Sequence, residues 1–204
     1  GVGKITRFDA GEMPVQIAAE LKDFDPTAYM PKTLARTMDP FMQFAFIAAE
    51  QAIADSGLCI ESESNRVGIV MGTAMDGVTT VAQTQAAFDE GKRVGPRFVP
   101  MTIGNIAAAQ IAIAHGIHGP SLTLNTACSA GGAIMTATML LNSGEADAVL
   151  AVGGESILCP IVVSGLAQAK ALSRRNDDPE HACRPFDADR DGFVIGEGGG
   201  ALLI

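Results

Sequence analysis

The chain has 204 residues, of which 48% are hydrophobic and 18% are charged, and its formal net charge is -9. This composition indicates a folded protein rather than a disordered one, and the absence of a basic stripe argues against a nucleic-acid partner. No apolar segment reaches the length of a membrane span, and the opening GVGKITRFDAGEM lacks the apolar core of a signal peptide.

The first 38 residues contain three prolines and no long apolar period, so we expect them to be irregular. The first clear element is a helix over residues 39–57, in which Asp39 can cap the start, Pro40 fits the first turn and Gly57 ends the helix. The pattern further along predicts helices over residues 77–89, 105–115 and 129–143.

Short, continuous apolar runs predict buried strands between these helices. They cover residues 66–72, 120–125, 146–154 and 192–204, the last one after a polar loop over residues 173–191. Apolar strands that alternate with helices predict an α/β fold with a largely parallel sheet and helices on both of its faces. Because the sequence contains no repeat and no linker, we expect residues 1–204 to form one domain.

Both ends of the sequence have the character of internal segments. The first residue is Gly1 rather than Met, and the last residues, GGGALLI, fall within an expected strand. A buried strand is an unusual place for a natural terminus. We therefore expect the sequence to be an internal piece of a longer protein.

Cys128 lies where the expected strand over residues 120–125 gives way to the expected helix over residues 129–143. The N-terminal end of a helix offers free N–H groups and a positive dipole, which favour a thiolate and make the thiol nucleophilic. A cysteine can equally be a small buried hydrophobe. The position therefore predicts either a nucleophile or a core residue.

The other cysteines and the histidines suggest no further site. Four cysteines occur without any CxxC pair, which favours neither zinc nor a disulfide framework and indicates a reducing compartment, usually the cytosol. His115 and His118 precede the strand that leads to Cys128, and that strand should carry the thiol away from them. We expect these two histidines and His181 to be structural or exposed, which leaves the thiol without a base in this chain.

Two further motifs have structural interpretations. DADRDG, at residues 187–192, matches the start of an EF-hand loop, but the twelfth position, which requires glutamate, is Gly198. We therefore expect a polar turn there, and no metal site. GEGGGA, at residues 196–201, lacks the context of a nucleotide-binding loop and predicts close backbone packing.

Residues 98–144 contain no Asp, Glu, Lys or Arg. So long an uncharged segment predicts a deep core. It also suggests that a subunit interface covers the part of the segment that remains on the surface.

Several of these segments together resemble the β-ketoacyl synthases of the thiolase fold, and synthase II of that family in particular. TACSAGG, at residues 126–132, is similar to the active-site signature of that family. Five longer segments also match in the same order, which makes the resemblance specific. They are MDPFMQFAFIAAEQAIADSGL (38–58), RFVPMTIGNIAA (97–108), GPSLTLNTACSAGG (119–132), ALSRRNDDPE (171–180) and RPFDADRDGFVIGEGGG (184–200).

The resemblance implies an activity and a fold. In this family the cysteine takes an acyl group from acyl carrier protein, and malonyl-acyl carrier protein then loses CO₂ and attacks the thioester, so that the chain grows by two carbons. Neither a cofactor nor a metal is implied. The implied fold is a thiolase-like half-domain with a mixed, mostly parallel five-stranded sheet. The family takes two histidines and a lysine from a second, pseudo-symmetric half that this sequence lacks, together with the first strand and helix. The chain by itself is therefore expected not to catalyse condensation.

The resemblance also implies roles for individual residues. Cys128 matches the nucleophile, and Met75, Phe98 and Leu166 match positions that line the acyl pocket, where the family usually has Phe at position 166. Basic positions near the mouth of the tunnel correspond to Lys32, Arg36 and Lys170, which are expected to dock the carrier protein. A cytoplasmic homodimer through residues 98–144 is also expected.

Two alternative functions have the same fold. One is a ketosynthase domain of a polyketide synthase, or its non-catalytic chain-length-factor subunit, which typically lacks the cysteine. The other is a thiolase or another thioester-handling enzyme. The segment RPFDADRDGF, at residues 184–193, favours a synthase over a thiolase.

Overall fold

The computed structural model describes all residues, 1–204, and divides them into two compact units. The larger unit comprises residues 25–155 and 198–204, and the smaller unit comprises residues 1–24 and 156–197. The chain therefore passes from one unit to the other three times. The sequence at these three crossing points does not have the composition of a linker. For that reason the sequence pattern suggested a single domain.

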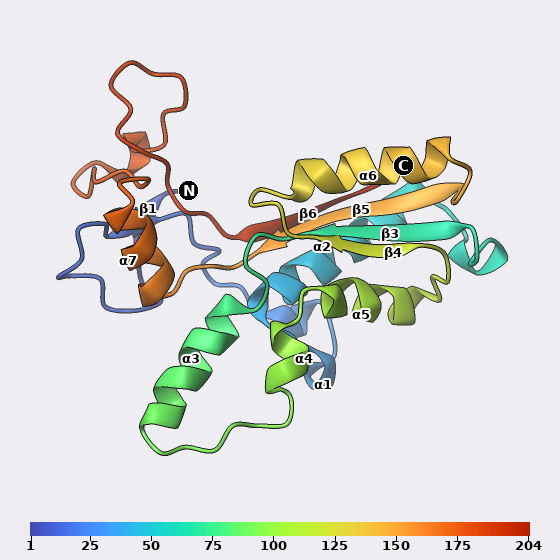
Figure 1. Cartoon of the computed structure of the whole chain (residues 1–204), viewed down its shortest axis with the longest axis horizontal. Helices are drawn as coiled ribbons and strands as arrows, with labels where there is room; N and C mark the ends of the chain where they lie inside the picture. The colour runs from blue at the N-terminus through green and yellow to red at the C-terminus, as the bar shows by residue number, and fades with distance from the viewer. The chain divides into compact units, whose positions relative to one another are not determined.

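A mixed sheet of four strands forms the centre of the larger unit, in the order β4-β3-β5-β6 (Figure 1). Its strands are β3 (Val67–Gly72), β4 (Ser121–Leu124), β5 (Ala148–Glu155) and β6 (Gly198–Leu203). β3 is parallel to both β4 and β5, whereas β6 is antiparallel to β5. The mostly parallel sheet and all four expected strands are confirmed.

The number of strands and the start of the last strand differ from expectation. The sheet has four strands rather than the five implied by the resemblance, because the other two strands of the chain are too short to join it and belong to the smaller unit. The remaining strands, β1 (Gly3–Lys4) and β2 (Ile17–Ala18), pair only with each other in the smaller unit. β6 begins at residue 198 rather than 192, because Phe193 and Gly196 instead form bridges to Leu172 and Ala19 in the smaller unit.

Helices cover both faces of the sheet, as expected (Figure 1). α6 (Ala130–Asn142) packs on one face, against β3 and β5. On the other face, α2 (Pro40–Ser56) packs against β5 and β6, and α5 (Asn105–His115) packs against β3 and β4. The largest core lies between the sheet and these last two helices.

The start of α2 is fixed by the buried carboxylate of Asp39. Its Oδ1 accepts a hydrogen bond from the N–H of Phe41 at 3.1 Å, which caps the helix as the sequence predicts. Its Oδ2 accepts from the hydroxyl of Thr80 at 2.6 Å, which joins α2 to α3 (Val78–Asp89). Burial raises the pKa of Asp39, and these hydrogen bonds oppose that effect.

Glycines allow α2 to lie very close to the sheet. A Cβ atom on Gly154 of β5 would lie 2.7 Å from the carbonyl oxygen of Phe41, and one on Gly199 of β6 would lie 2.5 Å from that of Phe44. Both distances are too short for any larger residue. The close backbone packing expected for GEGGGA is therefore confirmed at Gly199.

Several short helices were not expected from the sequence. α1 (Lys32–Ala35) and α4 (Phe98–Thr102) lie in the larger unit, and α7 (Pro160–Gln168) lies in the smaller one. α7 is brief and contains Gly165, so its apolar period is weak, although Pro160 at its first turn was an available signal. It packs in a separate core with the β1–β2 pair.

Candidate active site

Cys128 lies in a tight turn between β4 and α6, and its side chain is exposed. Of the two interpretations open from the sequence, the structure excludes the buried one for this residue, and Cys159 is the buried cysteine instead. Ala127, just before the thiol, has a φ of 55°, in the left-handed region that non-glycine residues rarely adopt. Such strain persists only where surrounding contacts impose it.

The hydroxyl of Ser129 imposes much of this geometry. It accepts a hydrogen bond from the N–H of Thr126 at 2.6 Å, and it lies 3.0 Å from the carbonyl oxygen of Thr73, to which it donates. Ser129 is 2% exposed, so both bonds are shielded from water. One side chain thus closes the turn and also joins it to the end of β3.

Two glycines bring the turn against the sheet. A Cβ atom on Gly72, the last residue of β3, would lie 2.5 Å from the carbonyl oxygen of Ser129. A Cβ atom on Gly153 of β5 would lie 2.8 Å from the side chain of Ala130. The turn can therefore approach these strands only because both positions lack a side chain.

The N-terminal end of α6 gives the site its chemistry. The first N–H groups of an α-helix have no acceptor within the helix, and the helix dipole makes that end positive. Cys128 directly precedes Ser129, the N-cap of α6. An oxyanion formed by attack of this thiol on an acyl carbonyl would be stabilised by this end of the helix.

A half-buried carboxyl group, Glu155, lies at the end of β5. Its Oε2 accepts hydrogen bonds from the N–H of Ala74 and, at 3.3 Å, from the hydroxyl of Thr73. Burial raises the pKa of Glu155, and these bonds work against that increase. The segment that follows β3 is thereby fixed to β5.

The residues expected to line an acyl pocket belong to different units. Met75 follows β3 and is 44% exposed, and Phe98 is half-buried at the start of α4; both lie in the larger unit. Leu166 lies on α7 of the smaller unit and packs partly against the core of that unit.

The residues expected to dock a carrier protein are all exposed. Lys32 and Arg36 lie one turn apart at α1, and the guanidinium of Arg97 donates to the backbone carbonyl of Arg36 at 3.0 Å. Arg97 is therefore a third cation of this group, and the sequence analysis did not identify it. Lys170, in the smaller unit, has a φ of 56° and borders an open cavity of about 890 Å³ that Arg190 also lines.

The histidines are placed as expected. The Nε2 of His115 lies 2.8 Å from the carboxylate of Glu50, and the backbone N–H of His118 donates to the carbonyl of Ser64, before β3 begins. Because β3 and β4 are parallel, these residues lie at the opposite end of the sheet from Cys128. His181 is exposed and pairs with Asp178 in the smaller unit.

Acidic side chains of the segment DADRDG pair with nearby residues. Asp187 pairs with Arg184 at 2.9 Å and accepts from the N–H of Asp189, while Asp191 accepts from the N–H of Arg174. No group of three or more metal-binding side chains occurs.

No helix has both the length and the apolar character needed to cross a membrane.

The sequence analysis missed the polar residues behind the thiol: Thr73, Ser129 and Glu155. Ser129 lies within the motif that was singled out, but a single serine does not reveal which carbonyl it will contact. A signal did exist for Glu155, because a charged residue at the end of the apolar run ADAVLAVGG requires a partner when buried.

Comparison with known proteins agrees with this geometry. The family model described as "Beta-ketoacyl synthase, N-terminal domain" matches residues 3–204. The chain belongs to the β-ketoacyl synthase family. It is 43% identical to 3-oxoacyl-[acyl-carrier-protein] synthase 2 of Synechocystis sp., over 100% of this chain and 50% of that protein.

Solved β-ketoacyl synthase structures show the same fold. The crystal structure of a β-ketoacyl synthase from Burkholderia phymatum covers 99% of this chain, with a TM-score of 0.85 and 27% identity, and 51% of that chain is matched. The ishigamide ketosynthase/chain length factor covers 99% of this chain, with a TM-score of 0.82 and 25% identity, and 50% of it is matched. The expected thiolase-like class is confirmed, and the chain spans about half the length of the curated relatives it matches.

Proposed function

We propose that residues 1–204 form the amino-terminal domain of a β-ketoacyl-[acyl-carrier-protein] synthase and that Cys128 is its acyl-accepting nucleophile. The observation that carries the proposal is the place of this thiol, which is exposed on a strained turn at the N-terminal end of α6. A nucleophile that forms a covalent intermediate needs both access to its substrate and stabilisation of the developing charge.

The proposed reaction has two steps. In the first, the Cys128 thiolate attacks an acyl thioester on the carrier protein, forms a new thioester and releases the carrier thiol. In the second, malonyl-acyl carrier protein loses CO₂, and its carbanion attacks the acyl-Cys128 carbonyl. The cysteine sulfur leaves and takes up a proton, and the product is a 3-oxoacyl carrier two carbons longer. Because no histidine of the larger unit lies near Cys128, the groups that assist decarboxylation would come from outside this chain.

Acyl carrier protein, an acidic partner, is the proposed source of both thioesters. The exposed cations Lys32, Arg36 and Arg97 lie together, and Lys170 is a further exposed cation in the smaller unit. On a chain of net charge -9, such a local cluster would orient an acidic partner and speed its association.

Met75, Phe98 and Leu166 are proposed to line the acyl pocket. In support, Met75 directly follows the segment Thr73–Ala74, which is hydrogen-bonded to Glu155 behind the Cys128 turn. Leu166 is smaller than the Phe usual at this position in the family, so this pocket would be wider at that point.

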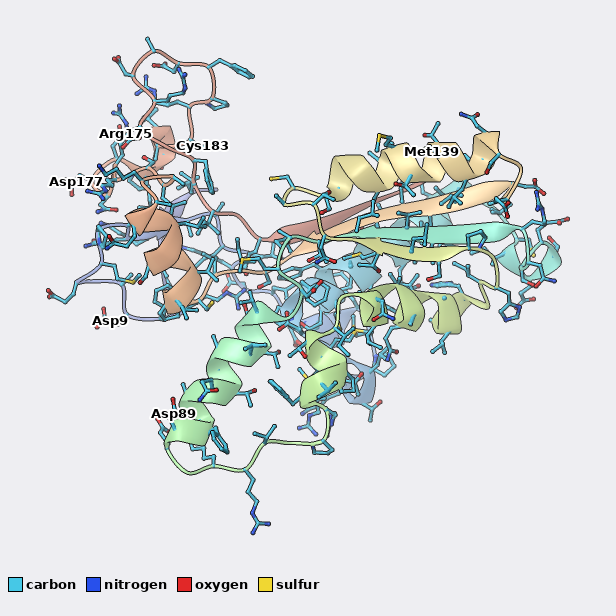
Figure 2. All side chains as sticks on the ribbon, viewed as in Figure 1. Asp9, Asp89, Met139, Arg175, Asp177 and Cys183 are labelled. Carbon is cyan, nitrogen blue, oxygen red and sulfur yellow. The ribbon has the colours of Figure 1, made fainter.

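We also propose a homodimer through residues 98–144, in the cytoplasm. The edge strand β4 pairs on one side only, with β3, and seven large apolar side chains of this segment are exposed. They are Val99, Ile103, Ile113, Leu122, Ile134, Met135 and Met139, of which Figure 2 labels Met139 on α6. Met135 and Met139 lie one turn apart on α6 and form an exposed apolar stripe, and such stripes mark interfaces. Four cysteines without a disulfide suit a reducing compartment.

A condensation assay tests the proposed function. The protein at its natural length is incubated with an acyl-carrier and a malonyl-carrier substrate, and the 3-oxoacyl product is measured. Cys128→Ala should abolish formation of the product. The matched control is Cys183→Ala, which removes another exposed thiol and should leave turnover intact. Turnover that persists in Cys128→Ala would reject the assignment.

A second candidate function is that of a polyketide ketosynthase domain or its chain-length-factor subunit, which the match to the ishigamide ketosynthase/chain length factor favours. The presence of Cys128 argues against a non-catalytic subunit. Extension of one acyl chain by several malonyl units without reduction would support the polyketide role, and release after one extension would support the fatty-acid role.

A further inference from the structure

A largely buried group of polar residues lies directly behind the Cys128 turn. Ser129, on the turn, donates a hydrogen bond to the backbone carbonyl of Thr73 at 3.0 Å. The hydroxyl of Thr73 donates in turn to Glu155 at 3.3 Å, and the N–H of Ala74 donates to the same carboxylate oxygen. These contacts run without a break from the turn, through the end of β3, to the end of β5.

Two of these residues are fully buried and Glu155 is half-buried, and a polar group in such surroundings costs free energy unless it is paired. Ser129 and Thr73 are each 2% exposed. The Oε1 atom of Glu155 is buried and has no hydrogen-bond partner, so this carboxyl is retained at a net cost to folding. A buried polar atom without a partner calls for an explanation, and support of the neighbouring turn supplies one.

The contacts act on the strained part of the turn. The hydroxyl of Ser129 bonds Thr126 on one side of Ala127, and the backbone N–H of Ser129 donates to the carbonyl of Ala127 at 2.7 Å. Ala127 has its positive φ between these contacts, one residue before the thiol. A second bond, from Asn125 to Asp76 at 2.8 Å, joins the start of the turn to the segment after β3.

We propose that Ser129, Thr73 and Glu155 are positioning residues that hold the Cys128 turn in its strained conformation and so aim the thiol along the start of α6. The proposal rests on the role of Cys128 given above, because it assigns these residues to the acyl-transfer step. They touch neither the thiol nor the acyl group, and they act through the backbone of residues 125–130.

The test compares the reactivity of Cys128 in variants of the protein at its natural length. Iodoacetamide alkylation is followed at each cysteine by peptide mass spectrometry, with the exposed Cys59 and Cys183 as internal references. Ser129→Ala, Thr73→Val and Glu155→Leu should each slow alkylation of Cys128 by about tenfold, since a misplacement of about 1 Å can cost up to 10²-fold in rate. The reference cysteines should keep their rates.

Conservative variants separate positioning from general stability. Thr73→Ser keeps the hydroxyl and Glu155→Gln keeps an acceptor oxygen, so both should recover most of the Cys128 rate. Ser143→Ala removes a hydroxyl at the other end of α6 and should change nothing. If Ser129→Ala does not fold, two comparisons still test the proposal: Thr73→Val with Thr73→Ser, and Glu155→Leu with Glu155→Gln.

Unchanged Cys128 rates in Thr73→Val and Glu155→Leu would overturn the proposal, as would an equal loss at Cys183. Alkylation does not depend on acyl transfer, so failure of the proposed function can be told apart from failure of this positioning proposal. In that case wild-type Cys128 would accept no acyl group from its carrier, while the alkylation rates would still differ among the variants.

Discussion

At the scale of single residues, the chemistry of the candidate site depends on where side chains lie relative to water. Cys128 is exposed although an uncharged segment surrounds it, whereas the carboxyl of Glu155 is half-buried behind the turn. The turn between them is held by backbone and hydroxyl hydrogen bonds rather than by ion pairs. Salt should therefore affect partner binding more than the geometry of the thiol.

The half-buried carboxyl of Glu155 leads to a prediction about pH. Burial raises its pKa, so the folded chain binds this proton more tightly than the unfolded chain does. Its contribution to stability is then fully present below the ordinary glutamate pKa, about 4.3, and is lost as the pH rises through the raised value. Glu155→Gln carries no charge at any pH, so it should have a higher urea midpoint than wild type at pH 8.

The same comparison supplies its own control. Below the ordinary pKa both side chains are neutral, and the difference between the two midpoints should shrink there. A Glu155→Gln protein that is less stable than wild type at pH 8 would mean that the carboxylate stabilises the fold.

At the scale of secondary-structure elements, glycines set how closely the Cys128 turn approaches the sheet. Gly72→Ala should destabilise the fold by about 1–3 kcal/mol, because its Cβ would meet the backbone of Ser129 and the turn would have to move. The matched control is Gly200→Ala on β6, where a Cβ meets nothing within 4 Å. That change should be neutral or stabilising by up to about 1 kcal/mol. Urea unfolding measures both, and equal effects would contradict this account.

The exposed cations proposed to dock the carrier protein give a second prediction at this scale. Reversal of Arg36 and Lys170 to Glu should raise the KM for the carrier-bound substrate and leave kcat unchanged, because docking precedes the chemistry. The KM of wild type should also rise with salt. Lys22→Glu, at another exposed cation, is the control for net charge. Identical kinetics in the Arg36 and Lys170 variants would remove these residues from the docking surface.

Elements with strong local signals could be predicted from the sequence. Gly57 was expected to end α2, and it has the left-handed φ that suits a helix end. Asp39 was expected to cap α2, and it does. Features that depend on distant residues could not be predicted: the second contact of Asp39, with Thr80, and the support of Ser129 by Thr73 arise only once the strands and helices have packed. The division into two units depends on such contacts as well.

At the scale of the whole molecule, the chain presents a face that its own core does not use. α6 packs on the sheet through small residues such as Ala133 and Ala137, while Met135 and Met139 remain exposed along it. An exposed apolar stripe on a helix that covers the sheet is the arrangement that a second copy could cover. This face and the Cys128 turn share α6, so the interface would lie close to the thiol.

The proposed homodimer can be tested by charging this face. Replacement of both Met135 and Met139 with Glu should convert a dimer to a monomer in sedimentation experiments, because burial of two carboxylates would be costly. Ile161→Glu, on α7 at an equally exposed apolar position, should leave the dimer intact. A dimer that survives the double replacement would place the interface elsewhere.

The most direct test of the central claim is to trap the acyl-enzyme. The protein at its natural length is incubated with acyl-acyl carrier protein and no malonyl donor, and its peptides are analysed by mass spectrometry. We predict one acyl group per chain, carried by the peptide that contains Cys128 and released by hydroxylamine, as a thioester would be. An acyl group on Cys59, Cys159 or Cys183 instead, or labelling that persists in Cys128→Ala, would contradict the account.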